Sequence, residues 1–170
     1  MPISDFTKLY DTAFPVLFRI AWRIAGSEEA AEDLCQDAFS KLYEKQMSFP
    51  NLDEAKYWLI RVVKNASINY AKRKQKEIKV YEKAFVENKH ESVSGESALV
   101  KKEMLHDVQS ALSKLPPRLY EVLVLKEYTE LNYKEIGRAL GISEGNVKVR
   151  VFRARERLQA NLEAEYGKLS

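Results

Sequence analysis

Residues 132–147 read NYKEIGRALGISEGNV, and this stretch predicts two helices joined by a short turn. Asn132 precedes an apolar run and Glu135 follows three residues later, which is the pattern of a capping box at a helix start. Gly141 can take the left-handed conformation that ends a helix, and Ser143 can cap the next one. Two helices joined in this way form a helix-turn-helix, the most specific local pattern in the chain.

The helix after this turn carries apolar side chains on two sides. Its predicted packing side is formed by Val147, Val151, Ala154, Leu158 and Leu162. Val149 and Phe152 lie outside that stripe, between two cationic flanks that comprise Arg150, Arg153 and Arg157 on one side and Lys148 and Arg155 on the other. A helix in the DNA major groove presents such a surface, because apolar atoms contact thymine methyls and cations contact guanine or phosphates. The alternative is that Phe152 packs on another domain or on a partner protein.

The first half of the chain also reads as helical. Pro15 is expected to break or kink the first apolar run, giving a short first helix and a second one. Ser27 is expected to cap a further helix of about 18 residues. Asp53 is expected to cap a helix that runs from about residue 54 to about residue 75.

This last helix combines a core stripe with a polar face. The core stripe is formed by Leu59, Val62, Val63, Ala66 and Tyr70. The opposite side carries Arg61, Asn65, Ile68 and Lys72, flanked by Trp58 and Asn69, so an aromatic ring, amides and cations share one surface. The basic residues that follow can neutralise phosphates. The alternative is a half-buried Trp at the domain edge followed by solvated lysines.

Composition and charge support two helical domains that bind anions. With 45% hydrophobic and 31% charged residues, the chain can bury a core, which excludes global disorder. The net charge of +3 conceals two basic segments. Residues 61–83 carry eight basic and two acidic side chains, and residues 132–157 carry seven and three. Two separate anionic contacts are therefore expected.

The predicted fold class is all-α, with two small domains joined by a flexible linker. Residues 88–98 lack periodicity and concentrate Ser, Gly and Glu, as linkers do. We place the first domain at residues 1–80, the linker at 81–103 and the helix-turn-helix domain at 104–170.

Several classes of protein are excluded by what the sequence lacks. Cys35 is the one cysteine, so no intramolecular disulfide can form, and the distant His90 and His106 are not expected to make a metal site with it. A Gly-rich phosphate loop and a catalytic constellation are both missing, and we expect no enzyme activity and no cofactor. The apolar run at residues 14–25 is too short to span a membrane, and no signal peptide is recognised, so we expect a cytoplasmic protein without membrane insertion.

These motifs, taken in order, resemble the extracytoplasmic-function sigma factors, which are promoter-specificity subunits of bacterial RNA polymerase. Residues 32–39 (EDLCQDAF), 58–65 (WLIRVVKN), 72–74 (KRK) and 140–150 (LGISEGNVKVR) carry the resemblance, which covers almost the whole chain. It implies that core polymerase is bound through its largest-subunit clamp helices and its flap. The residues implied in clamp binding are Asp33, Leu34, Gln36, Asp37 and Phe39.

The resemblance also implies two contacts with promoter DNA. The melted minus-ten element is assigned to Phe49, Trp58, Arg61, Asn65, Asn69, Lys72, Arg73 and Lys74. The duplex minus-thirty-five element is assigned to Tyr133, Lys134, Asn146, Lys148, Val149, Arg150, Phe152 and Arg153. Asn69, Asn146 and Val149 depart from the residues usual in the family, so the promoter sequence is not predicted.

Two further expectations concern partners and alternatives. The resemblance implies control by an anti-sigma factor, although no residue identifies it. The competing hypothesis is a stand-alone helix-turn-helix regulator that never binds polymerase. Such proteins usually need a dimer interface, and no heptad repeat is evident.

Overall fold

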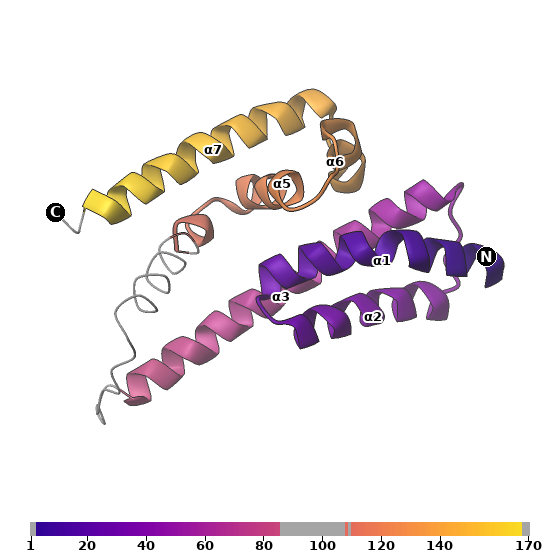
Figure 1. Cartoon of the computed structure of the whole chain (residues 1–170), viewed down its shortest axis with the longest axis horizontal. Helices are drawn as coiled ribbons and strands as arrows, with labels where there is room; N and C mark the ends of the chain where they lie inside the picture. Colours follow the sequence, from indigo (N-terminus) through magenta and orange to yellow (C-terminus); the bar gives the residue numbers. More distant parts are fainter. Residues whose placement is uncertain (1–2, 86–107, 109, 168–170) are drawn as a thin grey trace.

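The structure is a computed structural model that describes residues 3–85, 108 and 110–167. All regular elements in these ranges are helices, which confirms the predicted all-α class. They are α1 (Ile3–Ala25), α2 (Glu28–Glu44), α3 (Leu52–Phe85), α5 (Pro117–Glu127), α6 (Tyr133–Leu140) and α7 (Glu144–Gly167). Figure 1 shows α1, α2 and α3 grouped together, with α5, α6 and α7 forming the second group.

The first group is held by an apolar face on each helix. On α1 this face comprises Leu9, Ala13, Leu17, Ile20 and Ile24, all buried. On α2 it comprises Ala31, Cys35, Ala38, Phe39 and Leu42. Both faces pack on α3, where Leu59 and Val63 are fully buried. This arrangement leaves the polar side of α2 directed outward.

Pro15 does not divide α1, and the predicted break is wrong. The helix is continuous from Ile3 to Ala25 with Pro15 inside it. Proline removes the hydrogen bond to the carbonyl of Asp11, but Asp11 is exposed and that carbonyl can be solvated. Burial of Leu9 and Leu17 on either side of the proline favours one continuous helix over a broken one.

The N-terminal cap of α2 agrees with the prediction, whereas the N-terminal cap of α3 corrects it. The Ser27 hydroxyl accepts a hydrogen bond from the backbone N–H of Ala30 at 3.2 Å, as expected of an N-cap. For α3 the N-terminal cap is Asn51 rather than Asp53. The Asn51 side-chain oxygen accepts from the N–H of Glu54 at 2.9 Å, and Asp53 lies in the first turn.

Helix α3 is longer than predicted and leaves the domain. It ends at Phe85 instead of near residue 75. All side chains from Lys72 to Ala84 are exposed, and Figure 1 shows this half of α3 extending past the ends of α1 and α2. Strong helix formers continue through this part of the sequence, and nothing in it provides a stop signal such as Gly or Pro.

The second group contains the predicted helix-turn-helix. Asn132 and Glu135 form a capping box, with hydrogen bonds of 2.8 and 3.0 Å between each side chain and the other's backbone N–H. Gly141 ends α6 at φ +73°, in the left-handed region that favours glycine. Ser143 accepts from the N–H of Asn146 at 3.1 Å at the start of α7. All three predicted signals are confirmed.

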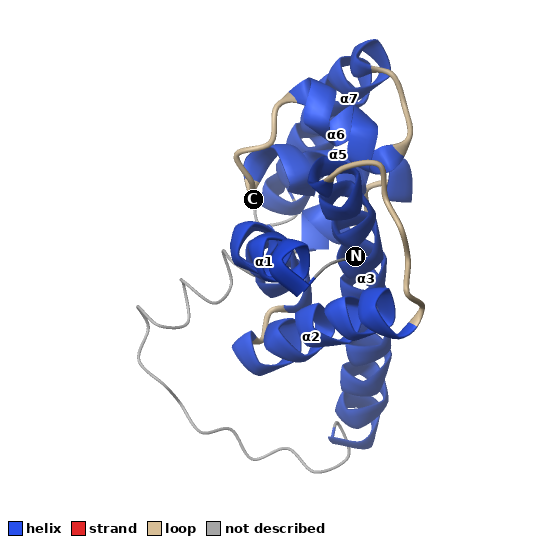
Figure 2. Ribbon diagram, turned by 90° about the vertical axis from the view of Figure 1, so that its right-hand side faces the viewer, coloured by secondary structure: helices blue, strands red, loops and turns tan. Residues whose placement is uncertain are grey.

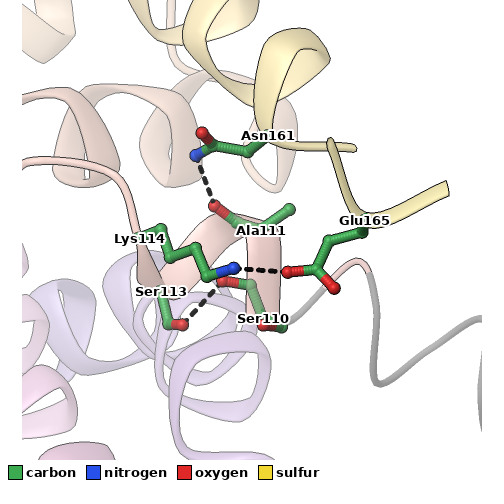
Figure 3. A network of polar contacts seen from close by, with 6 residues as sticks. All are labelled: Ser110, Ala111, Ser113, Lys114, Asn161 and Glu165. Carbon is green, nitrogen blue, oxygen red and sulfur yellow. Dashed lines mark hydrogen bonds and ion pairs between the residues drawn. The ribbon is translucent and has the colours of Figure 1, made fainter. Parts of the chain in front are cut away.

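Polar contacts fix the far end of α7 to the segment before α5. Residues 110–113 are helical, and Pro117 begins α5 as expected. The Asn161 amide donates to the carbonyl of Ala111 at 3.1 Å, and Lys114 pairs with Glu165 (Figure 3). Most of the predicted linker, and the start of the helix expected around Leu105, lie outside the described residues.

The two groups of helices pack against each other. α6 contacts α3, and α5 contacts α1 (Figure 2). One buried apolar cluster continues across this boundary and includes Leu125, Leu131 and Ile136 of the second group. We call this packing the closed arrangement.

Gly137 is expected to be sensitive to the smallest substitution. A Cβ at this position would lie 2.7 Å from the backbone carbonyl oxygen of Ile142, which cannot move without opening the turn. Gly137→Ala should lower the free energy of unfolding by about 1 to 3 kcal/mol in urea denaturation followed by circular dichroism. The matched control is Gly145→Ala, where a Cβ meets no atom within 4 Å. The control should gain up to about 1 kcal/mol, and an equal loss in both variants would contradict the clash.

Candidate functional site

The outer face of α2 is acidic and exposed. Asp33, Gln36 and Asp37 are exposed, and Leu34 is half-buried beside them. Glu28, Glu29 and Glu32 extend the same negative surface toward the start of the helix. These side chains point outward because the opposite face of α2 is buried against α1 and α3. The structure therefore brings four of the five residues expected to bind polymerase to one accessible face.

Phe39, the fifth residue of that set, lies in the core. It is 3% exposed, and its ring centroid lies 4.8 Å from that of Tyr10 and 6.1 Å from that of Phe6. Phe39 can therefore support the face from inside but offers almost no surface to a partner. Gln36 is also tied to α1, since its amide donates to the Tyr10 hydroxyl at 2.9 Å.

A cleft of about 250 Å³ adjoins the acidic face, and sequence reasoning missed it. Its lining is mainly aromatic and polar, comprising Phe6, Tyr10, Gln36, Phe39, Ser40, Tyr43 and Glu44. Tyr43 is 71% exposed. The sequence signal is an aromatic residue at every fourth position of α1, from Phe6 to Trp22. Because four residues turn a helix by about 400°, each ring is rotated by about 40° from the one before it, and the series gradually leaves the core side.

The residues expected to contact melted DNA lie mostly on one side of α3. Trp58 is half-buried, and its ring centroid lies 6.0 Å from that of Phe49, which comes from the loop before the helix. Asn65 and Asn69 are exposed on the turns that follow. An aromatic pair beside two exposed amides offers both a stacking surface and hydrogen-bonding groups. Lys72, Arg73 and Lys74 continue from this surface and are exposed.

Arg61, assigned to the same surface, has a different partner in this structure. Its Nε donates to the carbonyl oxygen of Ala139 in α6 at 2.9 Å. This carbonyl lies near the C-terminal end of a helix, where backbone oxygens carry partial negative charge. Arg61 is thus part of the contact between the two domains.

The neighbouring Lys64 forms the most buried ion pair among the described residues. Its ammonium lies 2.7 Å from a carboxylate oxygen of Glu121 in α5. The two side chains are 7% and 20% exposed. Sequence reasoning missed this pair because Lys64 reads as one more cation in a basic helix, and Glu121 lies 57 positions away.

Less buried contacts surround this pair. The guanidinium of Arg23 lies 4.9 Å from the ring centroid of Tyr128. Arg138 lies 5.9 Å from the ring of Tyr57. Arg19 approaches Glu130 at 4.0 Å, with both side chains exposed. Cations of one domain thus face aromatic rings or carboxylates of the other.

The start of α7 presents the apolar and cationic surface that the sequence predicts. Val149 is 45% exposed and Phe152 is 63% exposed, so Phe152 does not pack on the first domain. Asn146, Lys148 and Arg153 are also exposed, whereas Arg150 is half-buried. The opposite side of α7 is buried through Val147, Val151 and Ala154.

Residues of α6 border this surface. Lys134 is exposed, and the half-buried ring of Tyr133 lies between two ammonium groups. These groups belong to Lys126, at 4.5 Å from the ring centroid, and to Lys148, at 5.9 Å. The structure thus gathers all eight residues expected at the upstream element around the helix-turn-helix.

Cys35 is buried beneath these surfaces, and no metal site accompanies them in the part of the chain that the structure describes. Burial raises the pKa of the Cys35 thiol to about 12, so this group stays protonated at neutral pH. Within the described ranges, acids, Cys and His form no group of three suited to a metal. His90 and His106 lie outside these ranges. The described helices also include none that is long and apolar enough to cross a membrane.

The chain matches two family models in the order of its domains. Residues 9–77 match Sigma-70 region 2, and residues 105–158 match Sigma-70, region 4. The ECF RNA polymerase sigma factor SigM of Bacillus subtilis is 32% identical over 153 residues, covering 90% of this chain and 92% of SigM. SigW of the same organism is 29% identical over 169 residues, covering 92% and 88%.

Two solved structures resemble the whole fold. One is the sigma factor RpoE in complex with the anti-sigma factor NepR from Bartonella quintana, with a TM-score of 0.57 and 26% identity. It covers 95% of this chain and 98% of RpoE. The other is CnrH in complex with the cytosolic domain of CnrY, with a TM-score of 0.63 over 94% of this chain and 88% of CnrH. At 24% identity, CnrH supports the fold alone.

Removing the Glu121 charge is expected to open the closed arrangement. In Glu121→Gln the Lys64 ammonium would stay buried without a counter-charge, at a cost of about 3 kcal/mol or more. Separation of the domains returns Lys64 to water, so the radius of gyration from small-angle X-ray scattering should increase. Glu130→Gln is the matched control, because its ion pair is exposed and 4.0 Å long. An unchanged radius in Glu121→Gln would contradict a controlling role for the pair.

Proposed function

This chain belongs to the ECF RNA polymerase sigma factors, which bind core RNA polymerase and direct it to promoters, and we propose how its two domains divide this work. The first domain, residues 1–80, binds core polymerase and the melted minus-ten element. The second, residues 104–170, binds the minus-thirty-five element, and residues 81–103 connect them. The observation that carries the proposal is the exposed pair Val149 and Phe152 among cations on α7, in the domain that matches region 4.

The exposed face of α2 is the proposed contact with the polymerase clamp helices. Asp33 and Asp37 supply negative charge, Gln36 supplies an amide, and Leu34 supplies apolar area at the rim. A face of this kind complements a basic surface and orients its approach. Phe39 contributes by holding α2 against α1 rather than by direct contact.

The surface around Trp58 is the proposed site for an unstacked base of the non-template strand. A base taken out of the duplex exposes its aromatic face and its hydrogen-bonding edge. Phe49 and Trp58 can stack on the face, while Asn65 and Asn69 can bond to the edge. The exposed cations at residues 72–74 are placed to hold the adjoining phosphates.

The second domain inserts the start of α7 into the upstream major groove. Lys148, Val149, Phe152 and Arg153 are nearest the bases in this proposal. Tyr133, Lys134, Asn146 and Arg150 contact the edge of the groove and the phosphates. The capping box of α6 and the turn at Gly141 fix the angle at which α7 is presented.

Binding to both promoter elements requires the closed arrangement to open at Arg61. In the closed arrangement the Nε of Arg61 is held by the Ala139 carbonyl, and breaking this bond releases the whole guanidinium for DNA. The matched structure of RpoE is a complex with the anti-sigma factor NepR. We propose that an anti-sigma factor also controls this chain. We further propose that the chain itself acts in the cytoplasm and has no enzyme activity.

Run-off transcription with core polymerase and a promoter library tests the function directly. Start sites that depend on this chain support it. The alternative is a stand-alone regulator, which would bind duplex DNA tightly without core polymerase and would not change start-site selection.

Charge reversal on α2 should separate polymerase binding from DNA binding. Asp37→Lys is expected to weaken association with core polymerase by at least about tenfold, because it places a cation against a basic partner. Co-purification and a binding titration measure this effect. Glu163→Lys makes the same charge change on exposed α7 and should leave association intact. Undiminished association of Asp37→Lys would remove α2 from the interface.

Loss of Arg153 should affect one DNA sequence more than others. Arg153→Ala is expected to cost about 1 to 3 kcal/mol in binding of the holoenzyme to its own upstream element, if the guanidinium contacts a base edge. Competition with scrambled upstream sequences measures specificity. Arg157→Ala, one turn further along, is the control for a phosphate contact. An equal loss on all sequences would assign Arg153 to the phosphates as well.

A further inference from the structure

The projecting half of α3 carries a row of lysines, of which only the first, Lys72, is among the residues assigned to the minus-ten element. A helix rotates by about 100° per residue, which places Lys72, Lys76, Lys79 and Lys83 within a sector of about 60°. At about 1.5 Å per residue, the row extends over roughly 16 Å. All four side chains are exposed. We call these four residues the lysine row.

The lysine row has no counter-charges in its own sector. Glu77 and Glu82 lie outside the sector, and the ion pair on this part of the helix joins Glu77 to Lys74 at 3.7 Å. Among the described residues, none of the four lysines forms an ion pair. Four aligned ammonium groups that repel one another are stabilised by an anion with regularly spaced charges.

The lysine row continues the proposed DNA surface on the same side of the same helix. The helical rotation that aligns the lysines also places Trp58 and Asn65 within the same sector. Because α3 is one continuous helix from Leu52 to Phe85, the proposed site of the melted base and the lysine row lie on the same side of it. The chain then leads to the domain that binds upstream duplex in the proposed function.

We propose that Lys76, Lys79 and Lys83 bind phosphates of the duplex spacer between the two promoter elements. This inference rests on the proposed function and extends it to a third DNA contact. Lysine suits the role because its ammonium is a point charge that binds phosphate without reading bases. The span also fits, since Lys76 to Lys83 cover roughly 10 Å of the helix axis, and one strand of a duplex carries about three phosphates over that length.

The experiment measures how binding of the holoenzyme to promoter DNA depends on salt. Lys76→Gln, Lys79→Gln and Lys83→Gln are combined in one variant. For each phosphate that the variant no longer neutralises, the slope of log K against log salt should fall in magnitude by about 0.9, and by up to about 2.7 for three phosphates. Gln at the exposed Lys8 and Lys45 of the first domain controls for a general reduction of charge. An unchanged slope in the triple variant would overturn the proposal.

A second variant tests the orientation of the charges at constant composition. Exchanging Lys76 with Gln75, Lys79 with Val80, and Lys83 with Ala84 turns three positive charges about 100° around the helix and out of the sector. The net charge and helix content stay the same, and circular dichroism verifies the latter. The proposal expects the same decrease of salt dependence as in the Gln variant. A salt dependence equal to that of the wild type would show that only the net charge matters, and this result would overturn the proposal.

Two further measurements distinguish the spacer from other partners. On a fork template that lacks the spacer duplex, wild type and the Gln variant should bind equally. A difference that persists there contradicts a spacer contact. Weaker binding of the Gln variant to core polymerase without DNA would assign the lysine row to the polymerase and overturn the proposal. Failure of the proposed function is distinct, because wild type itself would then not direct initiation.

Discussion

A single ammonium group removed from water fixes how the two domains meet. Burying Lys64 is costly unless a carboxylate lies against it, and in the closed arrangement Glu121 supplies that carboxylate at 2.7 Å. The pair requires α5 to approach α3 at one position, which brings the Ala139 carbonyl to Arg61 and Tyr57 to Arg138. The other polar contacts across the boundary are longer or more exposed, and the apolar cluster that crosses it is non-directional, so the ion pair is the contact that tolerates displacement least.

Features encoded within a few residues could be predicted from the sequence. The Asn132 capping box, the left-handed Gly141 and the Ser143 cap are local hydrogen-bonding patterns, and each was found as expected. The exposure of Val149 and Phe152 follows from the rotation of one helix. Neither kind of feature depends on residues distant in the chain.

Features set by tertiary contact could not be predicted in this way. Local propensity suggested a break at Pro15, but burial on both sides of the proline keeps α1 continuous. A family pattern suggested Phe39 as a contact residue, but three aromatic rings of α1 surround it. The partners of Arg61 and Lys64 lie 78 and 57 positions away, where no periodicity connects them.

The unbroken course of α3 also has a mechanical consequence. Its 34 residues form one rod that is clamped by neighbours along its first half and unsupported along its second. From Trp58 to Phe85 the axis measures roughly 40 Å, so a tilt of about 5° at Trp58 moves the far end of the helix by roughly 3 Å. In the proposed function, a small movement of α3 on base capture would therefore become a larger displacement at Phe85, where the chain leaves for the second domain.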